Sequence, residues 1–508
     1  MISAASLCAA FSLGEDVFMQ YAEDRKIADE VLEDFASFAA IPRPSLHEKA
    51  ISDYLLDAFH ALGCNVVQDA SYNIIADREA TPGFEDVPRV ILQAHMDMVC
   101  VAAEGVVYDP LHDPIRLRKT GDKLSAEGTS LGADDGAGIA MILYVFRHAK
   151  NLGPLRAIIT TDEETGMTGA QALDANALAD ADFLINWDSE NYDRLTRGCA
   201  GSVSIEFRRK ISRRETPEGS AWRISINGLL GGHSGERIGD GRGNALRILA
   251  QTLHALKNAG ISISVGSMSG GSARNAIASE ADAVIVTQAE KADILRVIAE
   301  VEQRARIILK NVDSALQITL SKTEPPARIL SDADAKAITD ALLLLHTGIY
   351  QMSTTMPGLV ETSANLGLLR IEKNELWFSY FARSSIDEKL TELVDSCRIL
   401  GQRLGLEAEI GTPSPGWRER PKSALSDLMT KIFEMQTGRP MHVEVIHAGL
   451  ECGWHIKKAP QLDMVSIGVT THDIHSPQET LDITTIAPQV RLVMESLRQI
   501  ADGKCGGK

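Results

Sequence analysis

The chain has 508 residues, which exceeds what one hydrophobic core supports, so two or more domains are expected. Its formal net charge of −18 and pI near 5.2 disfavour nucleic acid and an anionic membrane as partners. Seven cysteines without a CxxC pair favour reduced thiols, and no apolar stretch reaches the roughly 20 residues of a membrane span.

The N-terminal stretch "MISAASLCAAFSLGED" is mildly apolar, but it has no Lys or Arg before its apolar part. A secretory signal needs such a basic start, so we expect a dispensable extension before Met19 instead. Together with the cysteine pattern, this predicts a cytoplasmic protein.

From about Ala28, helical and strand periods alternate along the chain. The predicted helices cover residues 27–41, 47–63 and 136–149. The predicted strands cover residues 87–98, 154–164 and 181–190, and each ends in acidic residues. Such alternation is typical of the α/β class, with a mostly parallel sheet covered by helices. Ligand sites in such sheets lie beyond the carboxyl ends of the strands.

After "RLTRGCAGS" the pattern changes. Strands are predicted at residues 220–230, 275–288 and 315–321, and as a hairpin at 366–384 with its turn at 372–374. Long helices are predicted at 291–310, 332–348 and 387–405. This indicates a second α/β domain, residues 203–412, inserted into a first domain made of residues 1–202 and 413–508. The linker back is "TPSPGWRERP", and a helix at 423–438 and strands at 442–446 and 462–468 follow it.

Ionisable side chains follow the predicted strands and the first helix start of the outer domain. They are His95, Asp97, Asp134, Asp135, Glu163, Glu164, Asp188 and His475. Positions i and i+2 of a strand share a face, so His95 and Asp97 are expected side by side. Acids gathered at one sheet edge repel one another, and divalent cations would neutralise them. Any one of these residues alone is equally well explained as a loop acid or a cap, but their number in one domain favours a metal site.

The ligand types limit the metal. Imidazole and carboxylate groups suit zinc, with manganese or cobalt as substitutes. Two such ions, roughly 3.5–4 Å apart, would hold a hydroxide between them for hydrolysis.

The ordered motifs of the chain resemble a known family. It is similar to the dinuclear-zinc metallopeptidases that include peptidase T, carboxypeptidase G and the aminoacylases, and within them to the aminoacyl-histidine (Xaa-His) dipeptidase branch. The resemblance covers nearly the whole chain from about Ala28. The motifs that carry it are "QAHMDMV", "GADDGAGIA", "DEETGMTGA", "NWDSE", "GGHSGERI", "GGSARNAI", "VETSANLG", "HAGLECG" and "IHSPQE".

The resemblance implies roles for the outer domain. His95 and Asp188 would hold one metal ion, Glu164 and His475 the other, and Asp134 would bridge both. Asp97 would hydrogen-bond and orient His95. Glu163 would be the general base, which passes a proton from the attacking water to the leaving amine.

The resemblance also implies substrate contacts. His233 in the inserted domain would donate to the oxyanion, supported by Asn275, and Arg383 would bind the terminal carboxylate of the substrate. The further predicted substrate residues are His447 and Glu451 of "HAGLECG", the latter for the amino group, and Gly468 with its backbone. At that last loop Val469 replaces the proline of the usual Gly-Pro-Thr, which leaves side-chain specificity open.

The resulting hypothesis is a two-metal dipeptidase of broad specificity for unblocked, Xaa-His type dipeptides. The resemblance implies a homodimer through the inserted lid domain, with His233 reaching the metal ions of the partner subunit. The large insert leaves a second possibility open, in which it folds back and His233 serves the site of its own chain. The alternatives are a related amidohydrolase that acts on N-acyl amino acids, tripeptides or C-terminal residues, and a scaffold protein that has kept only the fold. The second is disfavoured because no predicted ligand or base is missing.

Overall fold

The computed structural model describes residues 4–354 and 356–505, with side chains from residue 22 onward, and it divides into two compact units. Unit 1 comprises Met1–Gly198, Glu419–Val445 and Leu450–Lys508, and unit 2 comprises Cys199–Arg418 and Ile446–Gly449. Within the predicted extension before Met19, residues 4–18 belong to helix α1 (Ala4–Ala39), and their side chains lie outside the described ones.

The boundaries between the two units, at 198/199 and 418/419, differ from the predicted domain limits of 202/203 and 412/413. They differ because the two connecting segments pair with each other, Cys199 with Trp417 and Ser202 with Ser414. The predicted linker is therefore tied to the start of the second unit rather than free.

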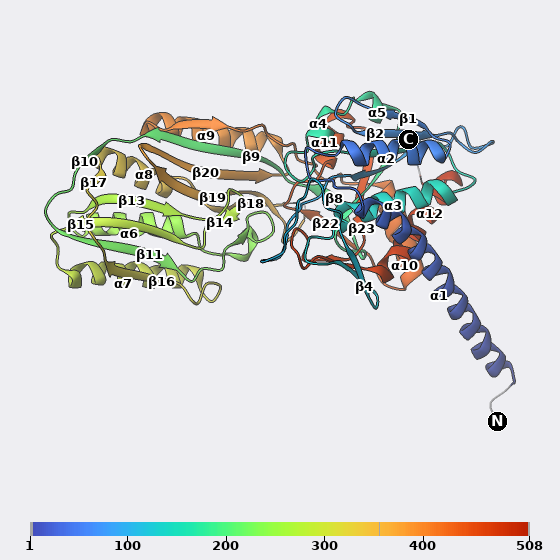
Figure 1. The fold of residues 1–508 in the computed structure, drawn as a ribbon, viewed down its shortest axis with the longest axis horizontal. Helices are drawn as coiled ribbons and strands as arrows, with labels where there is room; N and C mark the ends of the chain where they lie inside the picture. The colour runs from blue at the N-terminus through green and yellow to red at the C-terminus, as the bar shows by residue number, and fades with distance from the viewer. Residues whose placement is uncertain (1–3, 355, 506–508) are drawn as a thin grey trace. The chain divides into compact units, whose positions relative to one another are not determined.

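Unit 1 combines one large sheet, one small sheet and helices (Figure 1). Its helices are α1 (Ala4–Ala39), α2 (Lys49–Ala61), α3 (Ala133–His148), α4 (Thr168–Ala172), α5 (Asn176–Ala179), α10 (Ala424–Thr437), α11 (Cys452–Lys458), η2 (Ile483–Thr485) and α12 (Ile486–Ala501). The large sheet has the order β1 (Asn65–Gln68), β2 (Ile74–Arg78), β6 (Leu155–Thr160), β3 (Val90–His95), β7 (Phe183–Ser189), β23 (Asp463–Gly468), β8 (Arg194–Cys199) and β22 (His442–Ile446). The small sheet has the order β24 (Thr471–His472), β25 (Thr480–Asp482), β5 (Lys123–Ala126) and β4 (Leu117–Thr120).

The four central strands of the large sheet, β6, β3, β7 and β23, run parallel. The pairs β1–β2, β2–β6 and β23–β8 are antiparallel, so the predicted parallel sheet is confirmed for its centre and is mixed toward its edges. All residues of β3 and β6 are buried, which explains the apolar runs at residues 90–92 and 157–159 within them. The carboxyl ends of these strands lie at one edge, where His95 stands opposite Thr160.

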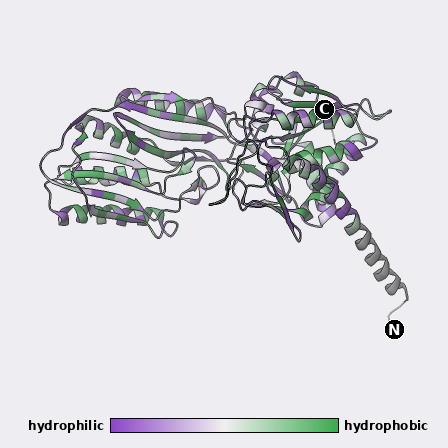
Figure 2. Cartoon of the chain, in the orientation of Figure 1, coloured by the Kyte–Doolittle hydropathy of each residue, from purple (hydrophilic) through white to green (hydrophobic). Residues whose placement is uncertain are grey.

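The core of unit 1 lies between the sheet and the layer formed by α1, α3, α10 and α12. α3 is buried along most of its length, from Ala137 to Phe146, because it packs on the sheet and under α1. Figure 2 shows green and purple residues along the same elements in both units, as expected of helices and strands with one buried face.

Unit 2 is built on a nine-stranded sheet. Its order is β16 (Gln317–Lys322), β11 (Ser220–Asn227), β15 (Ala281–Thr287), β13 (Ser264–Gly270), β19 (Val360–Glu372), β20 (Glu375–Ser384), β9 (Gly201–Lys210) and β21 (Glu407–Ile410), with β18 (Gly348–Met352) paired to β19. Two small ladders join β10 (Arg213–Glu215) to β17 (Arg328–Leu330) and β12 (Gly232–His233) to β14 (Ala276–Ile277). Its helices are η1 (Ile238–Asp240), α6 (Ala245–Asn258), α7 (Lys291–Leu309), α8 (Asp332–Leu344) and α9 (Asp387–Leu404).

The predicted hairpin is present as β19 and β20, and Lys373 in its turn has a φ of 53°. α6 is not among the predicted helices, although it shows the helical apolar period. The side chain of Asn244 caps the first turn of α6, and Leu246, Leu249 and Leu253 are buried on one face of this helix.

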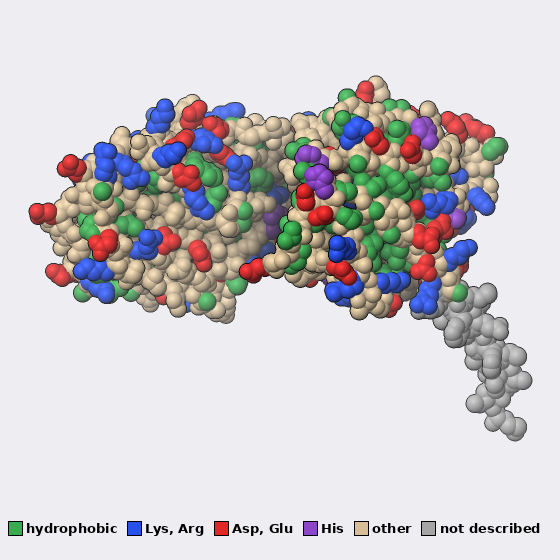
Figure 3. Space-filling model, viewed as in Figure 1, with side chains coloured by type: hydrophobic (Ala, Val, Ile, Leu, Met, Phe, Trp, Pro, Cys, Tyr) green, Lys and Arg blue, Asp and Glu red, His purple; other side chains and the backbone are tan. Residues whose placement is uncertain are grey.

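The surface is charged with both signs, and acidic and basic side chains are interspersed over the visible face of each unit (Figure 3). Within the part of the chain that the structure describes, no helix has both the length and the apolar character that a membrane span requires.

Candidate metal centre

The structure brings the five predicted metal ligands together in unit 1. His95 ends β3, Asp134 lies in the first turn of α3, and Asp188 lies near the end of β7. Glu164 lies in the loop after β6, and His475 lies between β24 and β25. The ligands therefore come from the strand ends of the parallel sheet and the loops beside them.

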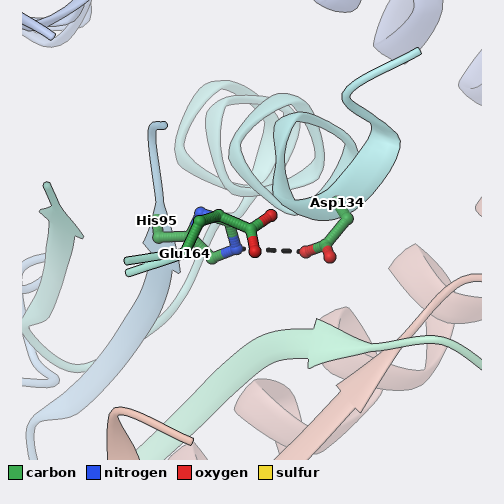
Figure 4. A group of neighbouring side chains, drawn as sticks. All are labelled: His95, Asp134 and Glu164. Atoms are coloured by element: carbon green, nitrogen blue, oxygen red, sulfur yellow. Dashed lines mark hydrogen bonds and ion pairs between the residues drawn. The ribbon is translucent and has the colours of Figure 1, made fainter. Parts of the chain in front are cut away.

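Asp134 lies between two histidines. Its Oδ1 is 3.0 Å from His95 Nε2, and its Oδ2 is 3.2 Å from His475 Nε2 (Figure 4 shows the first of these contacts). His95 Nε2 is also 3.5 Å from Asp188 Oδ1, and His475 Nε2 is 3.0 Å from Glu164 Oε1. The donor atoms thus form two sets, each with one imidazole and one carboxylate, that share the carboxylate of Asp134.

The charges of this centre are unbalanced without cations. Burial raises the pKa of Asp188 to about 7. Burial acts to lower the pKa of His475, but its hydrogen bonds to Asp134 and Glu164 prevail and raise that pKa to about 11. The pKa of His95 is likewise raised well above its usual value, since its carboxylate partners outweigh burial. The donor set of imidazoles and carboxylates fits divalent cations such as zinc, which would neutralise the carboxylates.

Asp135 adds a further acid beside the centre. His95, Asp135 and Asp188 have ligand atoms within 4.8 Å of one another, as do His95, Asp134 and Glu164. Burial and then the charge of Asp188 raise the pKa of Asp135 well above its usual value. One oxygen of Asp135 accepts a hydrogen bond of 3.2 Å from the backbone N–H of Gly138, which fixes this side chain against the first turn of its own helix, α3.

Asp97 is fully buried and connects His95 with the loop of the two glutamates. Its Oδ1 is 3.4 Å from His95 Nδ1 and accepts a hydrogen bond of 3.0 Å from the Glu163 N–H. Its Oδ2 accepts from the Glu164 N–H at 3.2 Å and from the Ser45 hydroxyl at 2.7 Å. Asp97 therefore fixes both the ring of His95 and the start of the glutamate loop.

Glu163 is half-buried beside this centre. Burial, followed by the charge of Asp188, raises the pKa of Glu163 well above its usual value. A carboxylate with a raised pKa holds a proton more readily than an ordinary surface glutamate, which suits a proton carrier.

Two buried side chains that the sequence did not indicate hold the ligand loops through the backbone. Glu479 accepts hydrogen bonds from three successive N–H groups, those of Leu131 at 2.7 Å, Gly132 at 3.0 Å and Ala133 at 2.8 Å. The guanidinium of Arg43 donates to the carbonyls of Gly132, Met96 and Asp97. These contacts connect the Asp134 turn with the His475 loop and with the end of β3. The "IHSPQE" motif contains Glu479, but nothing in its spacing reveals a backbone partner.

Gly468 and Glu451 lie in unit 1 within the same sheet region. A Cβ at Gly468 would lie 1.7 Å from the carbonyl oxygen of Ser189, so only glycine allows this strand to pass beside the residue that follows Asp188. Glu451 is fully buried, and its carboxylate accepts hydrogen bonds of 2.6 Å from Gln93 Nε2 and from the Thr160 hydroxyl. Burial raises the pKa of Glu451 to about 8.

The other predicted substrate residues gather in unit 2. His233 Nε2 lies 3.3 Å from a guanidinium nitrogen of Arg383. A Cβ at Gly235 would lie 2.8 Å from the carbonyl oxygen of His447, 3.1 Å from His233 Cε1 and 3.3 Å from Arg383 Cζ. Glycine at this position therefore lets the three residues converge.

The electrostatics of this group favour an anion. Burial lowers the pKa of Arg383 to about 10, and among the described residues no carboxylate lies within ion-pairing distance of its guanidinium. Burial, with the charge of Arg383, lowers the pKa of His447 to about 3, and its Nε2 is 2.7 Å from the Ser363 hydroxyl. Asn275 is exposed next to the β12–β14 ladder, where its carbonyl oxygen accepts from the Ser234 N–H at 2.8 Å.

The model of the Peptidase family M20/M25/M40 matches residues 91–499. The chain belongs to this peptidase family. It is 34% identical over 474 residues to the cytosol non-specific dipeptidase of Escherichia coli strain K12, which covers 92% of this chain and 96% of that protein.

Solved structures agree with this assignment. The aminoacylhistidine dipeptidase from Vibrio alginolyticus has a TM-score of 0.82 at 32% identity, over 92% of this chain and 96% of that one. A tripeptidase from Staphylococcus aureus has a TM-score of 0.56 at 17% identity, over 94% and 99% of the two chains, and shows the shared fold alone. The predicted resemblance to the M20 peptidases and their dipeptidase branch is confirmed.

Metal binding should release protons from the metal-free protein near pH 8. The pKa of His475, raised to about 11, keeps this imidazole protonated at that pH, whereas a metal ligand must be a neutral imidazole. Calorimetric titration with zinc in two buffers of different ionisation enthalpy measures the number of protons released. A binding enthalpy that is the same in both buffers would contradict the charge assignment.

Proposed function

We propose that the protein is a metal-dependent dipeptidase that hydrolyses unblocked dipeptides, of the Xaa-His type and with broad specificity, in the cytoplasm. The observation that carries the proposal is the pair of imidazole–carboxylate sets sharing Asp134 at the sheet edge. The two similar proteins named as dipeptidases, each covering more than nine tenths of this chain, support the substrate class.

We assign His95 and Asp188 to one divalent ion, Glu164 and His475 to a second, and Asp134 to both. Zinc fits this donor set, and manganese and cobalt are chemically close to it. When bound, the ions would polarise the scissile carbonyl and make the attacking water more acidic.

The side chains around the ions would move the protons. Glu163 takes a proton from the attacking water and delivers it to the leaving amine, since its raised pKa lets it hold a proton between the two steps. Asp97 keeps His95 in one orientation through the 3.4 Å contact to Nδ1.

Unit 2 would bind the charged parts of the substrate. Arg383, buried and without an acidic partner among the described residues, suits the terminal carboxylate of a dipeptide. His233 and Asn275 would donate to the oxyanion, and His447 lines the same group. Gly468 would offer its backbone. We also propose that the protein forms a homodimer through the inserted unit, and that His233 acts on the partner subunit.

Replacing Glu163 by Gln should leave the bound metal unchanged but slow turnover by about 10²–10⁴-fold, because only proton transfer is removed. Glu104→Gln, at an exposed glutamate of the same unit, is the matched control and should behave as wild type. Metal content and kcat are measured on both variants. A Glu163→Gln enzyme with wild-type kcat would show that another group carries the proton.

A blocked substrate should be cleaved poorly. Amidation of the C-terminus removes the partner of Arg383, which should cost about 1.5–3 kcal/mol, or at least tenfold in kcat/KM. Arg383→Met should lower kcat/KM for the free dipeptide and have little further effect on the amidated one. Rapid hydrolysis of N-acetylated amino acids would instead favour an acylase.

Mixing two inactive homodimers tests where His233 acts. In an equal mixture of His233→Ala and Glu163→Gln subunits, half of the dimers are mixed. If His233 serves the partner, one of the two sites in each mixed dimer is intact, so about a quarter of wild-type activity should return. Verified subunit exchange without recovery would place His233 in its own subunit's site.

A further inference from the structure

Glu451 lies at the start of α11, beneath the sheet edge that carries the metal ligands. The residue is 0% exposed, and both of its hydrogen bonds go to strand residues, Gln93 of β3 and Thr160 of β6. The remaining oxygen, Oε1, is buried and finds no hydrogen-bond partner among the described residues. The Glu451 carboxylate is therefore hydrogen-bonded to the central sheet of unit 1.

The hydrogen bonds continue across the sheet toward one metal ligand. Gln93 stands opposite Asn186 in the β3–β7 ladder, and Gln93 Oε1 accepts from Asn186 Nδ2 at 2.6 Å. Asn186 Oδ1 in turn accepts from the backbone N–H of Asp188 at 3.3 Å. All three side chains, those of Glu451, Gln93 and Asn186, are fully buried.

The same carboxylate reaches the other ligands through Thr160. Thr160 stands opposite His95 in the β3–β6 ladder, and its hydroxyl is 2.6 Å from Glu451 and 3.2 Å from the carbonyl oxygen of Ala94. Thr160 is also the last residue of β6, directly before the loop that carries Glu163 and Glu164. One side chain thus connects the three strand ends on which the metal centre is built.

We infer that Glu451 is a positioning residue, which acts through Gln93, Asn186 and Thr160 to hold His95, Asp188 and the glutamate loop in place. This differs from the sequence prediction that Glu451 receives the substrate's amino group. The inference rests on the proposed function, because it concerns the same ligands.

The two roles need different properties of the side chain. Binding the ammonium group of a substrate requires the negative charge of the Glu451 carboxylate. Accepting hydrogen bonds from Gln93 and Thr160 requires only an oxygen in the same position, which the amide of glutamine also provides. Leucine offers a similar volume and no acceptor. The amide nitrogen of Gln93 and the hydroxyl of Thr160 would then keep only their longer contacts, from Gln93 Nε2 to the Thr160 hydroxyl at 3.3 Å and from that hydroxyl to the Ala94 carbonyl at 3.2 Å.

The experiment uses the full-length protein loaded with cobalt, whose absorption spectrum reports the ligand arrangement. The variants are Glu451→Gln, Glu451→Leu and Gln93→Leu. The matched control is Gln489→Leu, which removes a buried amide from α12, where neither side-chain polar atom has a hydrogen-bond partner among the described residues. The readouts are the spectrum, cobalt affinity in competition with a chelator, and kcat and KM for an unblocked dipeptide.

Positioning predicts that Glu451→Gln and Gln489→Leu keep the wild-type spectrum and stay within about threefold of wild-type kcat and KM. Glu451→Leu and Gln93→Leu should change the spectrum, weaken cobalt binding by about 10–100-fold and lower kcat with little change in KM. Gln93→Leu keeps the test decisive if Glu451→Leu does not fold.

Two results would overturn the inference. One is a Glu451→Gln enzyme with a wild-type spectrum and a strongly raised KM, which would assign Glu451 to the substrate amine. The other is an unchanged spectrum and cobalt affinity in Gln93→Leu. Wild-type protein that binds no cobalt would contradict the proposed function, and the inference with it.

Discussion

Repulsion among closely spaced carboxylates is the constraint on which the rest of the structure depends. Asp134, Asp188, Glu163 and Glu164 are half-buried and meet near the carboxyl ends of the parallel strands, where burial disfavours the charged form of each carboxyl group. Among the described residues, His95 and His475 face these carboxylates, which raise the pKa of both imidazoles. Cations would stabilise a centre of this charge, and the sharing of Asp134 between two imidazoles supports the proposal of two ions rather than one.

The acidic residues around the candidate metal centre fall into two groups with different functions. One group lies at the centre itself. The other group accepts hydrogen bonds from the backbone or from strand side chains and so fixes the position of the ligands; its members are Asp97, Glu479 and Glu451. In unit 2, His233, Arg383 and His447 converge around Gly235, and among the described residues no carboxylate lies within ion-pairing distance of the buried Arg383 guanidinium.

Strand periodicity predicted the parallel centre of the sheet, and it explains why the acidic and imidazole side chains after these strands lie close together. The assignment of metal ligands among them came from the family resemblance and stays a prediction. Periodicity could not reveal the role of Arg43, whose guanidinium donates hydrogen bonds to three backbone carbonyls. Nor could it reveal the hydrogen bond between Gln93 and Glu451, which are 358 residues apart. The connection of residues 446–449 to unit 2 depends on a similar long-range contact, that of Ala200 with the Ile446 and Ala448 carbonyls. Local patterns carry no information about such pairs.

The central claim is that one shared carboxylate organises two metal ions, and metal stoichiometry tests it most directly. Metal-free protein is dialysed to equilibrium against zinc, and bound zinc per chain is measured for wild type, His475→Ala and Asp134→Ala. The account predicts about two ions for wild type, about one tight ion for His475→Ala and a loss at both positions for Asp134→Ala. Fully active wild-type protein with one tightly bound ion or none, or two tight ions retained in Asp134→Ala, would contradict it.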